Sequence, residues 1–184
     1  MRKTIFSFVS LLVFVSCETG EENPPGDPMP LVLGNYWLYE AEGPDSTYHV
    51  LDTLADTLNF SGYHAYLLWH RTPDGTDTVF AYYDDEGYLV WADVGVSDTL
   101  FTRVAKRDMA PGDTWSTWPG SPVIMRVGER ETLHLSAGDF EALPVMMSTG
   151  TDTMAIHWFS FGAGRVQHLD FGGFYHRLVE YKLN

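Results

Sequence analysis

From residue 35 to the C-terminus, hydrophobic and polar positions alternate in short runs that Gly, Pro and Asp interrupt. This pattern is typical of antiparallel β-strands joined by tight turns, and no stretch has the three- and four-residue apolar spacing of a helix. The pattern predicts an all-β fold, a single antiparallel β domain whose curved sheet forms a sandwich or a half barrel. A first strand opens at Tyr36, and later strands are predicted at 63–70, 98–105, 123–128, 129–136, 140–148, 152–160, 164–170 and 174–183.

Two turns have recognisable chemistry. The stretches 73–75 (Pro-Asp-Gly) and 84–87 (Asp-Asp-Glu-Gly) each end on a glycine, which supplies the positive φ that closes a hairpin. The acidic residues at 84–86 lack the ligand spacing of a calcium-binding loop, so we interpret them as a hairpin tip.

Individual strands carry further expectations. In the strand 63–70, alternation puts Tyr66 and Trp69 on opposite faces, and both faces are partly apolar. That strand is therefore expected to be central and covered on both sides, or to line a pocket. Pro144 is expected at a sheet edge or a bulge. The apolar alternation that ends at Leu183 predicts a paired and buried C-terminal strand in the same core as Trp37.

The N-terminus resembles a bacterial lipoprotein signal. Residues 1–16 combine a basic head with the apolar run 5–15, which is the layout of a signal peptide and is too short to span a bilayer. The stretch Val-Phe-Val-Ser-Cys resembles a lipobox, with Phe14 in place of the usual aliphatic residue. Cys17, the one cysteine of the chain, is therefore predicted to be acylated. The alternative is ordinary cleavage near Ser16, which leaves a free thiol.

Residues 17–30 are predicted to comprise the acylated cysteine and an acidic, Pro-rich tether, and residues 31–184 are predicted to form the β domain. We expect residues 18–29 to bury nothing and to be removable without loss of stability. A sorting or surface-export signal is a second interpretation of the acidic residues beside the lipid.

Charge restricts the partners. The formal net charge is −14 at pH 7, so the surface repels phosphate backbones and anionic headgroups. Nucleic acid is excluded as an expected partner, and membrane association is assigned to the N-terminal lipid anchor. Stability rests on packing and hydrogen bonding, because no second cysteine exists to form an intrachain disulfide.

Five phrases, taken in order, are similar to a broad group of uncharacterised bacterial lipoproteins. The resemblance implies a curved antiparallel β domain of an envelope protein and brings no known activity. Phe161 departs from the pattern, because members often have Pro before the first Gly of G-x-G. The phrases are PLVLGNYWLYE (30–40), APGDTW (110–115), TLHLSAGDFEALPV (132–145), HWFSFGAGRV (157–166) and LVEYKLN (178–184).

Motifs for catalysis or cofactors are absent from the sequence. It contains no Gly-x-Ser-x-Gly, His-Glu-x-x-His, Walker or Cys-x-x-Cys pattern, and the glycines at 162 and 164 lack the βαβ context of a nucleotide loop. His64 and His70 share a strand face but lie about 20 Å apart. A zinc site would have to be assembled from several strands, for example with His134 or His157. We therefore predict no catalytic residue, metal or cofactor.

Three functional hypotheses follow. The first is a non-catalytic lipoprotein of the bacterial cell envelope, anchored in the outer membrane and facing the periplasm or the cell surface, that binds a partner protein, an apolar ligand or a glycan, or serves assembly. The second is a lipid-carrier-like half barrel, and the third is a hydrolase or metal enzyme. The candidate ligand contacts for the second are Tyr66, Trp69, Trp91, Met146 and Met147.

Overall fold

The alternating runs form the strands of one antiparallel sheet in the computed structural model, which describes residues 26–94 and 99–184. Among the described residues there are thirteen strands and no helix, so the prediction of one all-β domain with a curved sheet is confirmed. The strands are β1 (Tyr36–Glu42), β2 (Thr47–Phe60), β3 (Tyr63–Thr72), β4 (Gly75–Tyr83), β5 (Tyr88–Val94), β6 (Thr99–Lys106), β7 (Thr114–Ser116), β8 (Val123–Val127), β9 (Glu131–Leu135), β10 (Gly138–Thr149), β11 (Asp152–Ser160), β12 (Gly164–Leu169) and β13 (Tyr175–Lys182).

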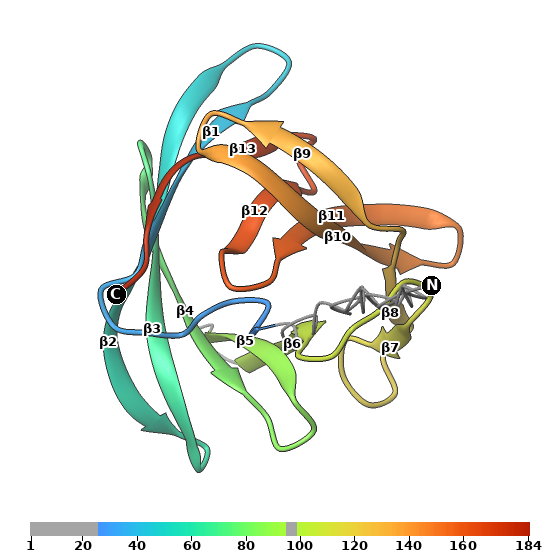
Figure 1. Ribbon diagram of the computed structural model, residues 1–184. Coiled ribbons are helices and arrows are strands. Elements are labelled where there is room, and N and C mark those ends of the chain that lie inside the picture. Colours follow the sequence, from blue (N-terminus) through green and yellow to red (C-terminus); the bar gives the residue numbers. More distant parts are fainter. Residues whose placement is uncertain (1–25, 95–98) are drawn as a thin grey trace, which may run out of the picture.

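The sheet curls into a nearly closed barrel (Figure 1). Its strand order is β6-β5-β4-β3-β2-β1-β13-β12-β11-β10-β8-β7, and β9 pairs with the first half of β10. The two ends of the sheet meet, because the Arg103 amide of β6 donates to the Thr117 carbonyl just after β7 at 2.8 Å. The Trp115 indole of β7 donates to the Arg103 carbonyl at 2.9 Å. The protein is therefore a barrel with a short seam and not a two-sheet sandwich.

Both predicted turns are present, but the expectation for Gly75 is wrong: it begins β4 without a positive φ, and Pro73 and Asp74 form the turn after β3. The stretch 84–87 connects β4 to β5, and Gly87 has a φ of +81°. The Asp84 carboxylate accepts hydrogen bonds from the backbone amides of Glu86 and Tyr88 at 3.0 and 2.9 Å, and it forms an ion pair with Arg103. These contacts explain an acidic residue at that turn without a metal ion.

Part of the predicted tether packs against the barrel, which corrects the expectation that residues 18–29 bury nothing. Met29 is only 2% exposed, and its backbone amide and carbonyl both hydrogen-bond to the Tyr83 hydroxyl. Asp27 forms an ion pair with Arg107 at 2.8 Å. Residues 18–25 lie outside the described residues. The segment from residue 26 runs across one end of the barrel, drawn in blue in Figure 1, and so fills that end with an apolar side chain.

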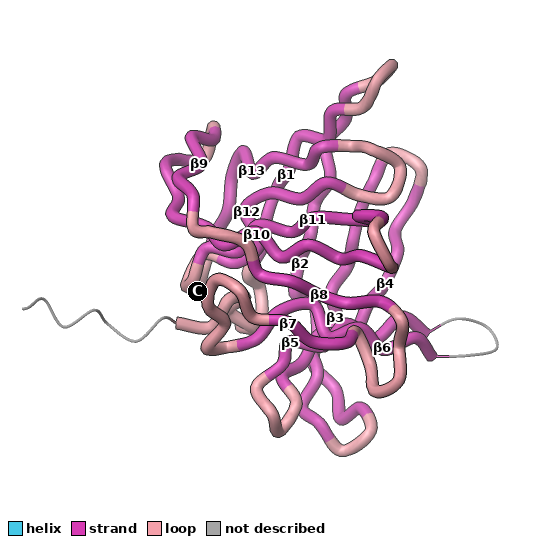
Figure 2. The backbone as a smooth tube through the Cα atoms, turned by 90° about the vertical axis from the view of Figure 1, so that its right-hand side faces the viewer, coloured by secondary structure: helices cyan, strands magenta, loops and turns pink. Residues whose placement is uncertain are grey.

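The chain ends meet as predicted, because β1 pairs with β13 and places Trp37 opposite Tyr181. Trp37 and Leu178 are both fully buried in the main core. The expectation of a buried C-terminus is wrong at its last residues, since Tyr181 and Leu183 are 36% and 37% exposed. Figure 2 shows the barrel from the side, with the C-terminus and the N-terminal segment at the same end. That end is the closed one.

Two smaller expectations, about β3 and Pro144, are corrected in part. β3 is a central strand and its His70 lines a pocket, as expected. Its outer face, however, is covered by an aromatic cluster and not by a second layer; the cluster includes Tyr63 of β3 stacked on Tyr82 of β4 at 4.7 Å. β10 is not an edge strand, since it pairs with β11 along one side. Pro144 lies where the other side of β10 changes partner from β9 to β8. Proline has no amide hydrogen to donate, and neither β8 nor β9 pairs with β10 at this residue.

Candidate functional site

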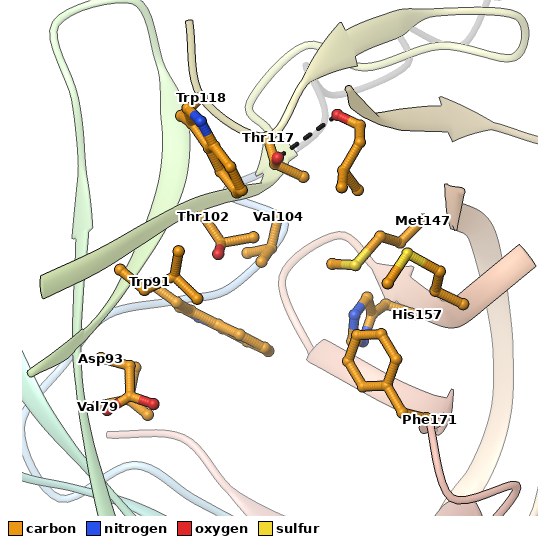
Figure 3. Close-up of a pocket in the computed structure, with 13 residues that line it drawn as sticks. Val79, Trp91, Asp93, Thr102, Val104, Thr117, Trp118, Met147, His157 and Phe171 are labelled. Atoms are coloured by element: carbon orange, nitrogen blue, oxygen red, sulfur yellow. Dashed lines mark hydrogen bonds between the residues drawn. The ribbon is translucent and has the colours of Figure 1, made fainter. Parts of the chain in front are cut away.

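A largely apolar pocket of about 350 Å³ opens near the start of β6 and the end of β10. Its walls come from β4, β5 and β6, from the loop between β7 and β8, and from β8, β10, β11 and the β12–β13 turn. Figure 3 shows Trp91 and Val104 across the pocket from Met147, His157 and Phe171. The principal apolar side chains are Val104, Trp91, Trp118, Met147, Met154 and Phe171.

Alternation along the strands selects the lining. Val79 of β4 pairs with Asp93 of β5, and two residues earlier on β5 Trp91 pairs with Thr102 of β6. Residues paired across a sheet share a face, so these side chains all point inward. The lining is therefore a row of inward positions near one end of the barrel.

Beside the apolar pocket lies a polar pocket of about 460 Å³. Its wall includes His70 of β3, Asp77 of β4 and Asp93 of β5. Val79 and Asp93 belong to the lining of both pockets, so the two spaces are adjacent. Together they form an amphipathic site with an apolar part and an acidic part.

A buried ion pair crosses the barrel interior next to these pockets. The Arg165 guanidinium of β12 donates to Asp52 Oδ2 of β2 at 2.8 Å, and the two side chains are only 7% and 1% exposed. His70 Nδ1 donates to the other carboxylate oxygen of Asp52 at 2.6 Å. The Arg165 guanidinium also stacks on the Trp91 ring, 4.8 Å from its centre. The ion pair thus supports one wall of the apolar pocket.

Asp52 is ionised at neutral pH. Burial by itself raises the pKa of Asp52, but the hydrogen bond from His70 and the charge of Arg165 outweigh burial and hold this pKa below its ordinary value. An ionised carboxylate only accepts hydrogen bonds, so His70 Nδ1 must carry the proton that it shares with Asp52. In the neutral imidazole the other nitrogen, Nε2, is then an acceptor.

Three histidines form a buried row on β11, β12 and β13. The rings of His168 and His176 stack at 3.9 Å, and His157 lies 6.0 Å from His168. Burial, followed by the charge of Arg165, lowers the pKa of His157 to about 3 and that of His168 well below its usual value. Burial also lowers the pKa of His176, against the opposing effect of its hydrogen bond to Asp170. All three rings are therefore neutral at pH 7.

Several polar atoms in this region have no hydrogen-bond partner within the part of the chain that the structure describes. They are Trp91 Nε1, Arg165 Nε and Nδ1 of His157, His168 and His176. Buried polar groups are normally hydrogen-bonded, so this concentration marks the interior beside the pocket as unusual.

The structure brings together only some of the predicted ligand contacts. Trp91 and Met147 line the apolar pocket. Tyr66 lies on the inner face and packs against the main core, outside the pocket lining. Trp69 and Met146 are each one residue away from an inward position, Leu68 and Met147, so they face outward. Cys17 lies outside the described residues.

Sequence reasoning missed Asp52 and Arg165 as interior residues. A signal for Asp52 exists, because it stands two residues from both Val50 and Leu54, which are fully buried. An acidic residue at an inward, apolar position has to find a buried partner. The sequence holds no equivalent signal for which cation, 113 residues away, would supply it.

The histidines named as possible zinc ligands do not converge. His157 is buried in the barrel, whereas the side chain of His134 is 75% exposed and pairs with Asp139. Within residues 26–94 and 99–184, no three His, Cys, Asp or Glu side chains are arranged to hold a metal ion.

Among residues 26–94 and 99–184 there is no helix with the length and apolarity to cross a membrane.

Comparison with known proteins identifies solved structures with a similar fold. No protein-family model and no curated protein matches this sequence. Two solved structures share the fold. One is a putative lipoprotein of Parabacteroides distasonis, 14% identical, with a TM-score of 0.52 over 86% of this chain and 99% of that chain. The other is a putative exported protein with a YmcC-like fold from Bacteroides fragilis, 12% identical, with a TM-score of 0.50 over 84% of this chain and 98% of that chain. At these identities the likeness shows the fold alone.

Proposed function

We propose that this protein is a non-catalytic lipoprotein of the bacterial cell envelope, held to the membrane by acyl chains on Cys17, whose barrel binds an apolar ligand. The signal-like residues 1–16 and the solitary cysteine support the anchor. Two proteins of the same fold are described as a lipoprotein and an exported protein, which supports the same location.

The observation that carries the binding function is the apolar pocket. Its volume of about 350 Å³ lies within the range of small-molecule sites and equals roughly a dozen groups the size of a water molecule, at about 30 Å³ each. Met147, Met154 and the rings of Trp91, Trp118 and Phe171 supply the contact surface. Each Å² of apolar ligand surface removed from water contributes about 25 cal/mol.

In this proposal, the acyl anchor and the pocket both serve the binding of an apolar molecule near a membrane. Lipid attachment keeps the barrel close to a membrane, where apolar molecules are concentrated, and the pocket shields one such molecule from water. The methionines suit this task because their flexible, polarisable side chains adapt to ligands of different shape.

Equilibrium dialysis tests the binding. The acylated full-length protein is reconstituted in zwitterionic nanodiscs and dialysed against radiolabelled decanol, and uptake by empty nanodiscs is subtracted. We expect saturable binding that Met147→Trp abolishes, because the larger ring fills the pocket. Met146→Trp, on the outer face of the same strand, is the matched control and should bind decanol like the wild type. Equal binding by both variants contradicts the assignment of the pocket.

Mutation of the anchor tests the location. Cys17→Ser should abolish acyl labelling and release the protein from the membrane fraction, because no other attachment chemistry is predicted from the sequence. Acyl labelling that persists in Cys17→Ser refutes Cys17 as the acylated residue. The dialysis experiment tests the pocket separately.

A further inference from the structure

The polar pocket next to the apolar one carries an unusual set of hydrogen-bonding groups. Asp77 and Asp93 are both exposed there, and none of the ion pairs between described residues involves either of them. The third group is His70, whose Nδ1 already donates a hydrogen bond to Asp52. The hydroxyls of Thr76 and Thr78 also line this pocket. The polar part of the site therefore combines hydroxyl groups, which can donate or accept a hydrogen bond, with two carboxylates that form no ion pair among the described residues.

The register of the strands places these groups at one rim. His70 pairs directly with Asp77 across β3 and β4, and Asp93 pairs with Val79, two residues from Asp77 on the same face. Val79 and Asp93 also line the apolar pocket, so the carboxylates stand where the apolar space meets the polar one.

A separate observation indicates that the apolar pocket is built to hold a molecule. His157 lines it, is only 7% exposed, and has no hydrogen-bond partner at Nδ1 within the described part of the chain. Figure 3 shows its ring directed into the space opposite Trp91. Buried polar groups are normally hydrogen-bonded, so this unmet nitrogen sets the lining of the pocket apart from an ordinary packed core.

We infer that the site binds a single-chain amphiphile with a protonated amine, whose hydrocarbon chain lies in the apolar pocket and whose ammonium group is received by Asp77 and Asp93. This inference rests on the proposed function and names the class of ligand. An ammonium group has three N–H donors and no acceptor, which matches a rim of two carboxylates and the hydroxyl oxygens of Thr76 and Thr78. The formal net charge of −14 attracts such a cation and repels carboxylate amphiphiles such as fatty acids.

The experiment compares three ligands with the same chain length in the nanodisc dialysis assay at pH 7.5 and low salt. Decylamine should bind more tightly than decanol, and decanoate most weakly. Asp77→Asn and Asp93→Asn should each weaken decylamine binding about fivefold, as expected for one partly solvated ion pair, and should leave decanol binding within twofold. Added salt should reduce the advantage of the amine.

Asp85→Asn is the control, because Asp85 is an exposed acidic residue at the β4–β5 turn that lines neither pocket. It should leave the affinities for all three ligands unchanged. Far-ultraviolet circular dichroism of the three Asp→Asn variants should match the wild type, since each replaced side chain is exposed.

The outcomes separate the two ideas. If decanol binds but decylamine has no advantage, or if the advantage persists in both rim variants, the amine assignment is overturned while the apolar site stands. Tightest binding by decanoate also overturns it. If no ligand binds the wild type above empty nanodiscs, the proposed function itself fails.

Discussion

The buried histidine His157 makes folding stability depend on pH. Its pKa is about 3 in the folded protein against an ordinary value of 6.5, because burial and the charge of Arg165 both oppose protonation. As the pH falls, the unfolded chain binds a proton first, so stability is lost progressively below about pH 6.5 and until about pH 3. For this one group, linkage gives a loss of about 2 kcal/mol between pH 7 and pH 5.

The surroundings of His157 offer no compensation. His168 and Arg165 on β12 and Trp91 on β5 are its neighbours, and none of them supplies a negative charge. His168 and His176 are shifted in the same direction, so the wild-type protein should lose more than the contribution of His157 alone.

Urea denaturation at pH 7 and pH 5 isolates the contribution of His157. The loss of unfolding free energy between these pH values should be about 2 kcal/mol smaller in His157→Phe than in the wild type. His49→Phe is the control, because the exposed His49 ring is in water in both states and its replacement should leave the loss unchanged. An equal loss in His157→Phe and the wild type would refute the reasoning.

Three further substitutions or deletions test the packing. Gly164→Ala should cost about 2 to 4 kcal/mol of unfolding free energy, because Gly164 has a φ of +102° and a Cβ there would lie 2.8 Å from the Trp37 ring nitrogen. Gly150→Ala, with no atom within 4 Å of the added Cβ, should cost less in the same urea titration. Met29→Ala should lower the unfolding free energy by about 3 kcal/mol, and an unchanged melting temperature would show that residue 29 only rests on the barrel. Removal of residues 178–184 should unfold the domain, because it breaks β13, which pairs with both β1 and β12; native near-ultraviolet dichroism in the truncated protein would contradict this.

The outer-face positions show one limit of sequence reasoning. Alternation within 63–70 separates Tyr66 from Trp69 in the sequence itself, and Met146 and Met147 must likewise face opposite sides. Sequence could therefore have excluded one methionine from the pocket, but it could not say which. The choice depends on which face of the strand turns toward the interior, and that is decided when distant strands pair and the sheet curls.

By itself, the sequence determined the elements with local causes. Apolar alternation defines strands such as β11 and β13, and glycine supplies the positive φ at turns such as 84–87. Both depend on neighbours within a few residues, so they are readable without the fold. The acidic composition is equally direct and limits the expected partners.

Only the tertiary structure decided the site. Asp52 and Arg165 lie 113 residues apart and meet because the β1–β13 pairing leaves only two strands between β2 and β12, and the curl of the sheet turns both side chains into the interior. The apolar pocket is likewise a product of closure, since its walls come from both halves of the chain. Strand alternation places a side chain on one of two faces, and long-range pairing alone determines what lies opposite it.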